Sequence, residues 1–121
     1  AVLLTRGDRY AAELLEELRE RTPGIQILCA GKLPSGTAEK LSLRDALTPA
    51  ERRGRGNAYA RGGWWLHDRI LTDTALTVIR ADVFARRDLL DPRSGTPLPT
   101  YRRQRYTGGI GRYFPIFLYI K

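Results

Sequence analysis

One histidine and one acid stand side by side at His67 and Asp68, in a stretch whose pattern predicts a strand. An imidazole and a carboxylate that share acid–base catalysis must lie within hydrogen-bonding reach of each other. Successive side chains of a strand point to opposite faces, so these two groups are held apart. We therefore interpret His67, the only histidine in the chain, as a residue packed near tryptophans and not as a catalytic base.

Other catalytic and ligand-binding patterns are also missing from the sequence. A zinc site needs three or four cysteine, histidine or carboxylate ligands, and the chain has a single cysteine, Cys29. The sequence contains no GxxxxGKS or GxxxxGKT phosphate loop and no serine in a GxSxG context. The glycine-rich run 108–111 precedes a predicted strand, where a nucleotide loop would open a helix, so we interpret it as a flexible turn. We expect no enzymatic activity, no metal and no cofactor.

Two segments interleave arginines with aromatic residues: 52–65 (RRGRGNAYARGGWW) and 101–114 (YRRQRYTGGIGRYF). Arginines neutralise phosphates and aromatic rings stack on bases, so the combination is typical of a sequence-independent nucleic-acid surface. The alternative is that the aromatic residues belong to a core or an interface and that the arginines only keep the protein in solution. The residues expected to face DNA or bind anions are Arg52, Arg53, Arg55, Arg61, Arg102, Arg103 and Arg105.

Positive charge is concentrated in the second half of the chain. Lysine and arginine number 21 against 13 acids, which gives a net charge of +8. Residues 1–51 have a net charge of −1 and residues 52–121 a net charge of +9, and the stretches 52–67 and 92–121 contain no acid. Eighteen of the cations are arginines, which suits bidentate contact with phosphate, although a GC-rich coding sequence would give the same bias. We expect one positive surface.

Length and composition indicate a globular chain. The 121 residues suit a single domain, and 42% hydrophobic and 28% charged residues argue against disorder. No apolar run approaches the roughly 20 residues of a membrane span, and no leader is visible at the N-terminus, so we expect neither a membrane span nor a secretory signal. The lone Cys29 excludes an internal disulfide and fits a reducing compartment.

The first 48 residues predict a helix followed by a strand. Residues 8–21 form an amphipathic pattern that Asp8 is expected to cap and that Pro23-Gly24 ends. Residues 25–30 follow as a short strand, and 37–47 are ambiguous. The expected apolar stripe of the helix is Ala11, Leu14, Leu15 and Leu18, and the expected buried face of the strand is Ile25, Ile27 and Cys29.

The middle of the chain predicts a loop and two strands. Residues 49–63 contain Gly54, Gly56 and four arginines, and we expect an exposed, mobile basic loop there. Strands are predicted within 64–72 and over 75–85, with a turn at Asp73-Thr74, and a loop is predicted over 91–99. On the second strand Arg80 and Asp82 share a face, which is expected to be partly wet. The expected class is α+β: a small antiparallel or mixed sheet with the N-terminal helix packed on one face, and long basic loops.

The predicted last strand, 112–120, is apolar on both faces. A small sheet covered by one helix has one dry face, so the second apolar face is left without cover, and Pro115 places the strand at an edge or a bulge. Such a strand predicts self-association or docking. The alternative is that residues 37–60 and 86–106 fold over it. The expected interface residues are Tyr113, Phe117, Tyr119 and Trp64.

Several short segments occur in the order found in one group of phage proteins. They are YAAELLEELRER (10–21), PGIQIL (23–28), Leu33-Pro34, RGG (61–63), LTVIRADVFA (76–85) and RYFPIFLY (112–119). In this order the chain resembles the tail terminator, or tail-completion, proteins of tailed bacteriophages. The resemblance implies an α+β structural protein that catalyses nothing and assembles in the host cytoplasm into the virion as a ring, commonly a hexamer. The ring caps the tail tube and docks with the head-connector proteins, and its positive side would make non-specific contact with DNA.

Two other functions remain open from the residues. The first is a cytoplasmic nucleic-acid-binding module that uses its arginine and aromatic loops, as a monomer or dimer. The second is a small enzyme acting on an anionic metabolite, since the run 65–82 with Arg69 is similar to chorismate lyases; the long segment after Asp82 argues against it.

Overall fold

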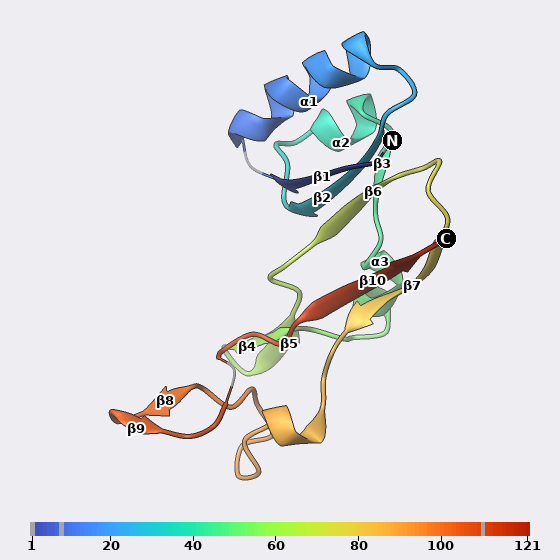
Figure 1. Cartoon of the computed structure of the whole chain (residues 1–121). Coiled ribbons are helices and arrows are strands. Elements are labelled where there is room, and N and C mark those ends of the chain that lie inside the picture. Colours follow the sequence, from blue (N-terminus) through green and yellow to red (C-terminus); the bar gives the residue numbers. More distant parts are fainter. Residues whose placement is uncertain (1, 8, 110) are drawn as a thin grey trace. The chain divides into compact units, whose positions relative to one another are not determined.

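The computed structural model describes residues 2–7, 9–109 and 111–121, and its helices and strands confirm the predicted α+β class (Figure 1). The described residues group into two compact units. Unit 1 consists of Ala1–Leu47, Asp68–Arg80 and Leu118–Lys121. Unit 2 consists of Thr48–His67 and Ala81–Phe117.

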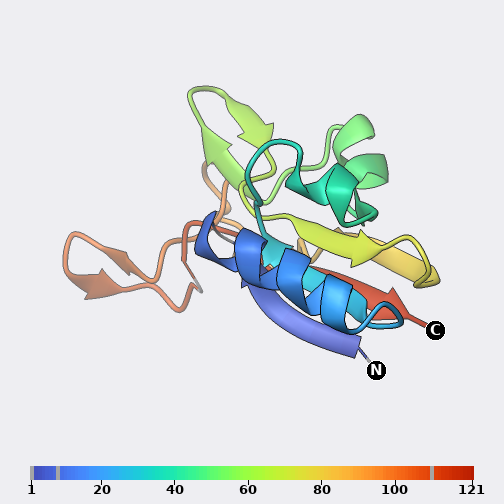
Figure 2. The same ribbon diagram turned by 90° about the horizontal axis from the view of Figure 1, so that it is seen from above.

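Unit 1 is built on a four-stranded mixed sheet in the order β1-β2-β6-β3. Its strands are β1 (Val2–Gly7), β2 (Gln26–Gly31), β6 (Ile70–Asp73) and β3 (Leu43–Asp45). β1 pairs in parallel with β2, while β6 is antiparallel to both β2 and β3. A parallel pair needs a crossover between its strands, and helix α1 (Arg9–Arg21) provides it. Figures 1 and 2 show α1 running along one face of the sheet above β1 and β2.

The core of unit 1 lies between α1 and this sheet. Ile27 and Cys29 of β2 are fully buried, as their alternation predicted. Helix α1 packs against them with Leu15 and with the partly buried Ala11, as the predicted stripe has it, whereas Leu14 is 57% exposed, so the predicted stripe is wrong at Leu14. The predicted cap, Asp8, lies outside the described residues.

Asp73 closes the turn after β6 and ties it to α1. Its carboxylate accepts a hydrogen bond from the amide of Ala75 at 3.0 Å, and its carbonyl accepts one from Leu76 at 3.0 Å, which confirms the predicted turn. Arg19 of α1 pairs with the same carboxylate at 2.6 Å. The ambiguous segment 37–47 contains a short helix α2 (Thr37–Lys40) and then β3.

Unit 2 has small elements joined by turns. They are α3 (Thr48–Arg52), β4 (Ala58–Ala60), β5 (Gly63–Trp65), a 3₁₀ turn η1 (Arg87–Leu89), β8 (Tyr101–Arg102) and β9 (Arg105–Tyr106). The prediction of an unstructured loop over 49–63 is therefore wrong in its secondary structure, and Gly56 in it is buried. A Cβ at Gly56 would lie 2.5 Å from the backbone nitrogen of Trp65, so this glycine serves close packing. The predicted strand within 64–72 is two strands, β5 and β6, in different units.

Strands β7 (Val78–Val83) and β10 (Ile116–Ile120) form a two-stranded sheet. The amide of Phe84 donates to the carbonyl of Pro115 at 2.7 Å, and the amide of Lys121 to that of Thr77 at 3.0 Å, so the strands are antiparallel. β10 lies at a sheet edge, as Pro115 predicted. Residues 78–80 and 118–120 belong to unit 1, and residues 81–83, 116 and 117 to unit 2.

The fully buried side chain of Asn57 links three segments of unit 2. Its Oδ1 accepts a hydrogen bond from the amide of His67 at 2.8 Å, and its Nδ2 donates to the carbonyl of Phe114 at 3.2 Å. Its backbone amide donates to Trp65 at 3.1 Å, and its carbonyl accepts from Phe114 at 2.7 Å. A buried amide with both ends satisfied fixes the register of the segments around it.

We expect Asn57→Ala to lower the free energy of unfolding by about 1–3 kcal/mol, because it leaves the buried carbonyl of Phe114 without its side-chain donor and the amide of His67 without its acceptor. Denaturant unfolding followed by tryptophan fluorescence measures the loss. Ser35→Ala, at an exposed polar residue, is the control and should change stability by less than about 0.5 kcal/mol. Equal stability of the two variants would contradict the linking role of Asn57.

Candidate functional site

The β4–β5 hairpin places aromatic side chains on both of its faces. Ala58 pairs with Trp65 and Tyr59 with Trp64. The connecting residues, Arg61 and Gly62, both have positive φ, 52° and 78°, which is the two-residue turn that suits the twist of a hairpin. Arg61 therefore lies at the end of the hairpin.

One face of the hairpin is an open row of rings. Ala58 also bridges Tyr113, and cross-strand partners share a face, so Trp65 and Tyr113 lie on the same side as the buried Ala58. The ring of His67 meets Trp65 edge-on at 4.9 Å and stacks on Tyr113 at 4.5 Å with an interplanar angle of 13°. Trp65 and Tyr113 are 42% and 44% exposed, and His67 is exposed as well. We call Trp65, His67 and Tyr113 the open aromatic face.

On the opposite face of the hairpin the rings pack on one another and on a buried ring, although Tyr59 and Trp64 remain 42% and 38% exposed. Trp64 stacks on Phe114 with ring centroids 5.6 Å apart, and Tyr59 meets Trp64 edge-on at 5.3 Å. Phe114 is 2% exposed. Trp64, predicted to lie in an interface, is thus anchored on the core of unit 2.

Two buried acids hold three of the predicted DNA-facing arginines. Arg55 contacts the carboxylate of Asp82 at 2.8 Å and Arg53 at 3.8 Å. Arg80 is exposed, as predicted for its face of β7, but Asp82 is buried because these arginines neutralise it. The sequence did not reveal either pair, because Arg53 and Arg55 lie in the acid-free stretch 52–67 and their partner Asp82 lies far along the chain.

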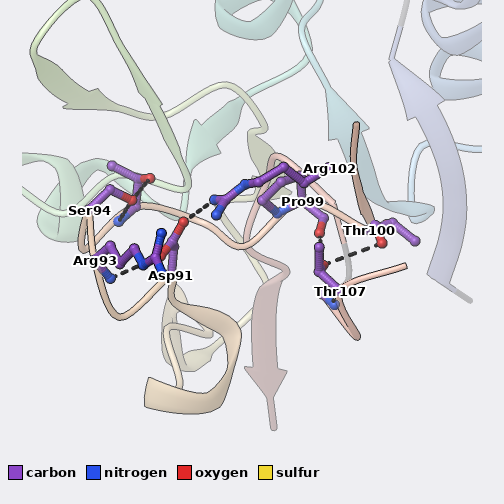
Figure 3. Close-up of polar contacts among 9 residues, drawn as sticks. Asp91, Arg93, Ser94, Pro99, Thr100, Arg102 and Thr107 are labelled. Atoms are coloured by element: carbon purple, nitrogen blue, oxygen red, sulfur yellow. Dashed lines mark hydrogen bonds and ion pairs between the residues drawn. The ribbon is translucent and has the colours of Figure 1, made fainter. Parts of the chain in front are cut away.

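Asp91 pairs with the β8–β9 hairpin at the strand residue next to its turn (Figure 3). Its carboxylate pairs with Arg102 of β8 and accepts a hydrogen bond from the amide of Arg93 at 2.9 Å. The hydrogen bonds from Arg102 and then from the Arg93 amide lower the pKa of the Asp91 carboxyl below its ordinary 3.8. Across the hairpin, the amide of Thr107 donates to Thr100 at 3.0 Å, and the Thr107 hydroxyl donates to the carbonyl of Pro99.

The tip of this hairpin consists of exposed basic and aromatic residues. Figure 1 shows β8 and β9 projecting from the other elements of unit 2. Arg103 and Gln104 both have left-handed backbones, with φ of 48° and 66°. Below them Tyr101 and Tyr106 pair across the strands, with their rings 5.8 Å apart.

The structure divides the predicted site residues into separate groups. Tyr113 and Tyr119 are exposed and Phe117 is half-buried. His67, interpreted from the sequence as packed, is exposed and lies between Trp65 and Tyr113. The signal for it was the spacing of two residues between Trp65 and His67, which puts both side chains on one face of an extended segment. Among the described residues no acid pairs with the other four predicted arginines: Arg52, Arg61, Arg103 and Arg105.

The two units differ in net charge. Unit 2 contains eleven arginines and four acids, a net charge of +7, while unit 1 contains ten cations and nine acids, a net charge of +1. The predicted positive surface therefore belongs to unit 2.

In the described part of the chain, no three cysteine, histidine or acidic residues are grouped so that they could hold a metal ion. None of the described helices combines the length and apolar character that a membrane span requires. Comparisons of the chain with protein-family models, with curated proteins and with solved structures found no match.

We expect Asp91→Asn to speed tryptic cleavage after Arg102, Arg103 and Arg105, because the hairpin loses the charge that holds Arg102. The cleavage sites are identified by mass spectrometry of timed samples. Asp88→Asn is the matched control, since Asp88 pairs with Arg86 on the surface, where such pairs contribute little. Equal cleavage rates would contradict the anchoring role of Asp91.

The same contact should respond to acid. Because the folded pKa of Asp91 lies below 3.8, its stabilising contribution is complete above that pH and is lost as the pH falls through the folded pKa. NMR spectra recorded between pH 5 and about 2 should show the amides of residues 101–106 shifting together with the Asp91 carboxyl. Hairpin amides that do not move with Asp91 would show that the carboxylate does not hold the hairpin.

Proposed function

We propose that the protein is a structural subunit of a tailed-phage virion: the ring-forming tail terminator, or neck component, that caps the tail tube and joins it to the head connector. The observation that supports it best is the exposure of β10. All five residues of this strand, IFLYI, are apolar or aromatic, yet none of them is buried.

The greatest exposure on this sheet lies in unit 1. Ile79 of β7 is 64% exposed, and Tyr119 and Ile120 of β10 are 60% and 38% exposed. Burying one such side chain is favourable by about 1.5–3 kcal/mol. β10 pairs with β7 alone among the described strands, so its outer edge offers backbone groups to a further strand. Ile79 lies opposite Tyr119, whereas Ile120, the next residue of the strand, points to the other face of the sheet. We call Ile79 and Tyr119 the assembly patch.

An exposed apolar strand favours association in general, and the proposed phage function specifies which assembly forms. The proposed function rests on the resemblance of six short segments to tail terminators, which implies a ring, commonly of six subunits, in the virion: 10–21, 23–28, 33–34, 61–63, 76–85 and 112–119. The net charge of +7 on unit 2 suits a surface beside DNA. Nothing in this role requires catalysis.

We expect light scattering to give a mass near six times 13.7 kDa, and the Ile79→Asp/Tyr119→Asp double variant to give a monomer. Two charges in an interface core oppose association without disturbing side chains that are already exposed in the subunit. Circular dichroism checks that the variant is folded. Tyr101→Asp, on the exposed hairpin of unit 2, is the control and should keep the wild-type mass.

A wild-type protein that stays monomeric at high concentration would overturn the proposal. So would a double variant that keeps the wild-type mass. A ring seen by electron microscopy would support the tail terminator over other self-associating proteins.

A further inference from the structure

We infer that the open aromatic face of unit 2, together with Arg61, binds single-stranded nucleic acid. The proposal goes beyond the assembly role and uses none of the residues of the assembly patch. It also gives Tyr113, predicted to lie in a subunit interface, a different role: stacking on a base.

The open aromatic face has the form of a stacking platform. Trp65, His67 and Tyr113 follow one another in direct ring contact, at 4.9 and 4.5 Å, above the small side chain of Ala58. On the other face of the hairpin Trp64 stacks on the buried Phe114, so that row is covered at one end, whereas Trp65 and Tyr113, at the two ends of this row, are 42% and 44% exposed. Successive bases of an unpaired strand stack on such rings whatever their sequence.

The platform is held in place before any ligand arrives. Asn57 bonds the backbone of Trp65, of His67 and of Phe114, the residue after Tyr113. All three rings of the face are therefore attached to segments that one buried residue fixes, through its side chain and its backbone. A surface that is already ordered loses less entropy when it binds.

Arginines without acidic partners border the platform. Arg61 and Trp65 line one hollow of about 510 Å³ at the end of the hairpin, together with Ala60, Gly63 and Trp64. Arg112, exposed, immediately precedes Tyr113, and no described acid pairs with it or with Arg61. Flat rings beside fixed positive charge match a polyanion whose bases are unpaired; a duplex keeps the faces of its bases covered.

Charge also decides between nucleic acid and a second copy of the chain as the occupant. Two copies meeting through this face would bring together two surfaces of units that each carry a net charge of +7. Like charges in contact oppose association, whereas a phosphate backbone releases its counterions on binding.

The test is fluorescence anisotropy of a labelled 15-residue oligo-dT at several salt concentrations. Trp65→Ala and Tyr113→Ala should each weaken binding about 10-fold or more, and Trp65→Phe, which keeps a ring, should stay within about 3-fold of wild type. Arg61→Asn, a residue that accepts the positive φ of this turn, should reduce the slope of log affinity against log salt by about 0.7. Tyr10→Ala, at an exposed aromatic residue of unit 1, is the matched control and should leave binding unchanged.

Three results would overturn the inference: no binding at low salt, wild-type affinity of Trp65→Ala and Tyr113→Ala, or a duplex bound as tightly as the single strand with no loss in these variants. If Trp65→Ala fails to fold, Trp65→Phe and the Arg61→Asn salt slope decide instead. Light scattering on the same variants separates this site from the assembly role. A change of mass without a change of affinity would mean that the face is a contact between copies.

Discussion

The hydrogen bonds of one buried amide, that of Asn57, determine the geometry of unit 2. Elements of two or three residues have too few ladder bonds to define their own register. Asn57 compensates because its side chain and backbone reach the segments at Trp65, at His67 and at Phe114. Except for Tyr59, each ring on the two faces of the hairpin lies at or next to a residue that Asn57 bonds, so the positions of these rings follow from this arrangement.

Two buried acids of the same unit divide its arginines into those that form ion pairs and those that do not. Asp82 and Asp91 are buried and hold Arg53, Arg55 and Arg102 against the protein. Asp91 offsets the charge of Arg102, and the single charge of Asp82 offsets one of its two arginines, Arg53 and Arg55. Arginines without an acidic partner in the described part of the chain, such as Arg61 at one hairpin end and Arg103 at the other hairpin, contribute their full charge to the positive potential that a ligand meets. Net charge alone would have counted all of them equally.

Features encoded by local pattern could be predicted from the sequence. The strand at Ile27 and Cys29, the turn at Asp73 and the edge position of β10 each follow from a few neighbouring residues. Strand β1 was missed because a short apolar run has no alternation and acquires its meaning only from its parallel partner, β2. The arginine–acid pairs were missed for the same reason, since Asp82 and Asp91 come from other parts of the chain. Gly56 was misread because glycine marks close packing as well as loops.

The turn between β8 and β9 has side chains at both positions where a two-residue hairpin is most relaxed with glycine. For residues other than glycine, a left-handed backbone costs on the order of 1 kcal/mol each. Glycine at both positions would avoid this cost, but the turn would then carry no side chains. With Arg103 and Gln104 at these positions, the turn instead presents a guanidinium and an amide, two groups that donate hydrogen bonds, and the backbone bears the conformational cost.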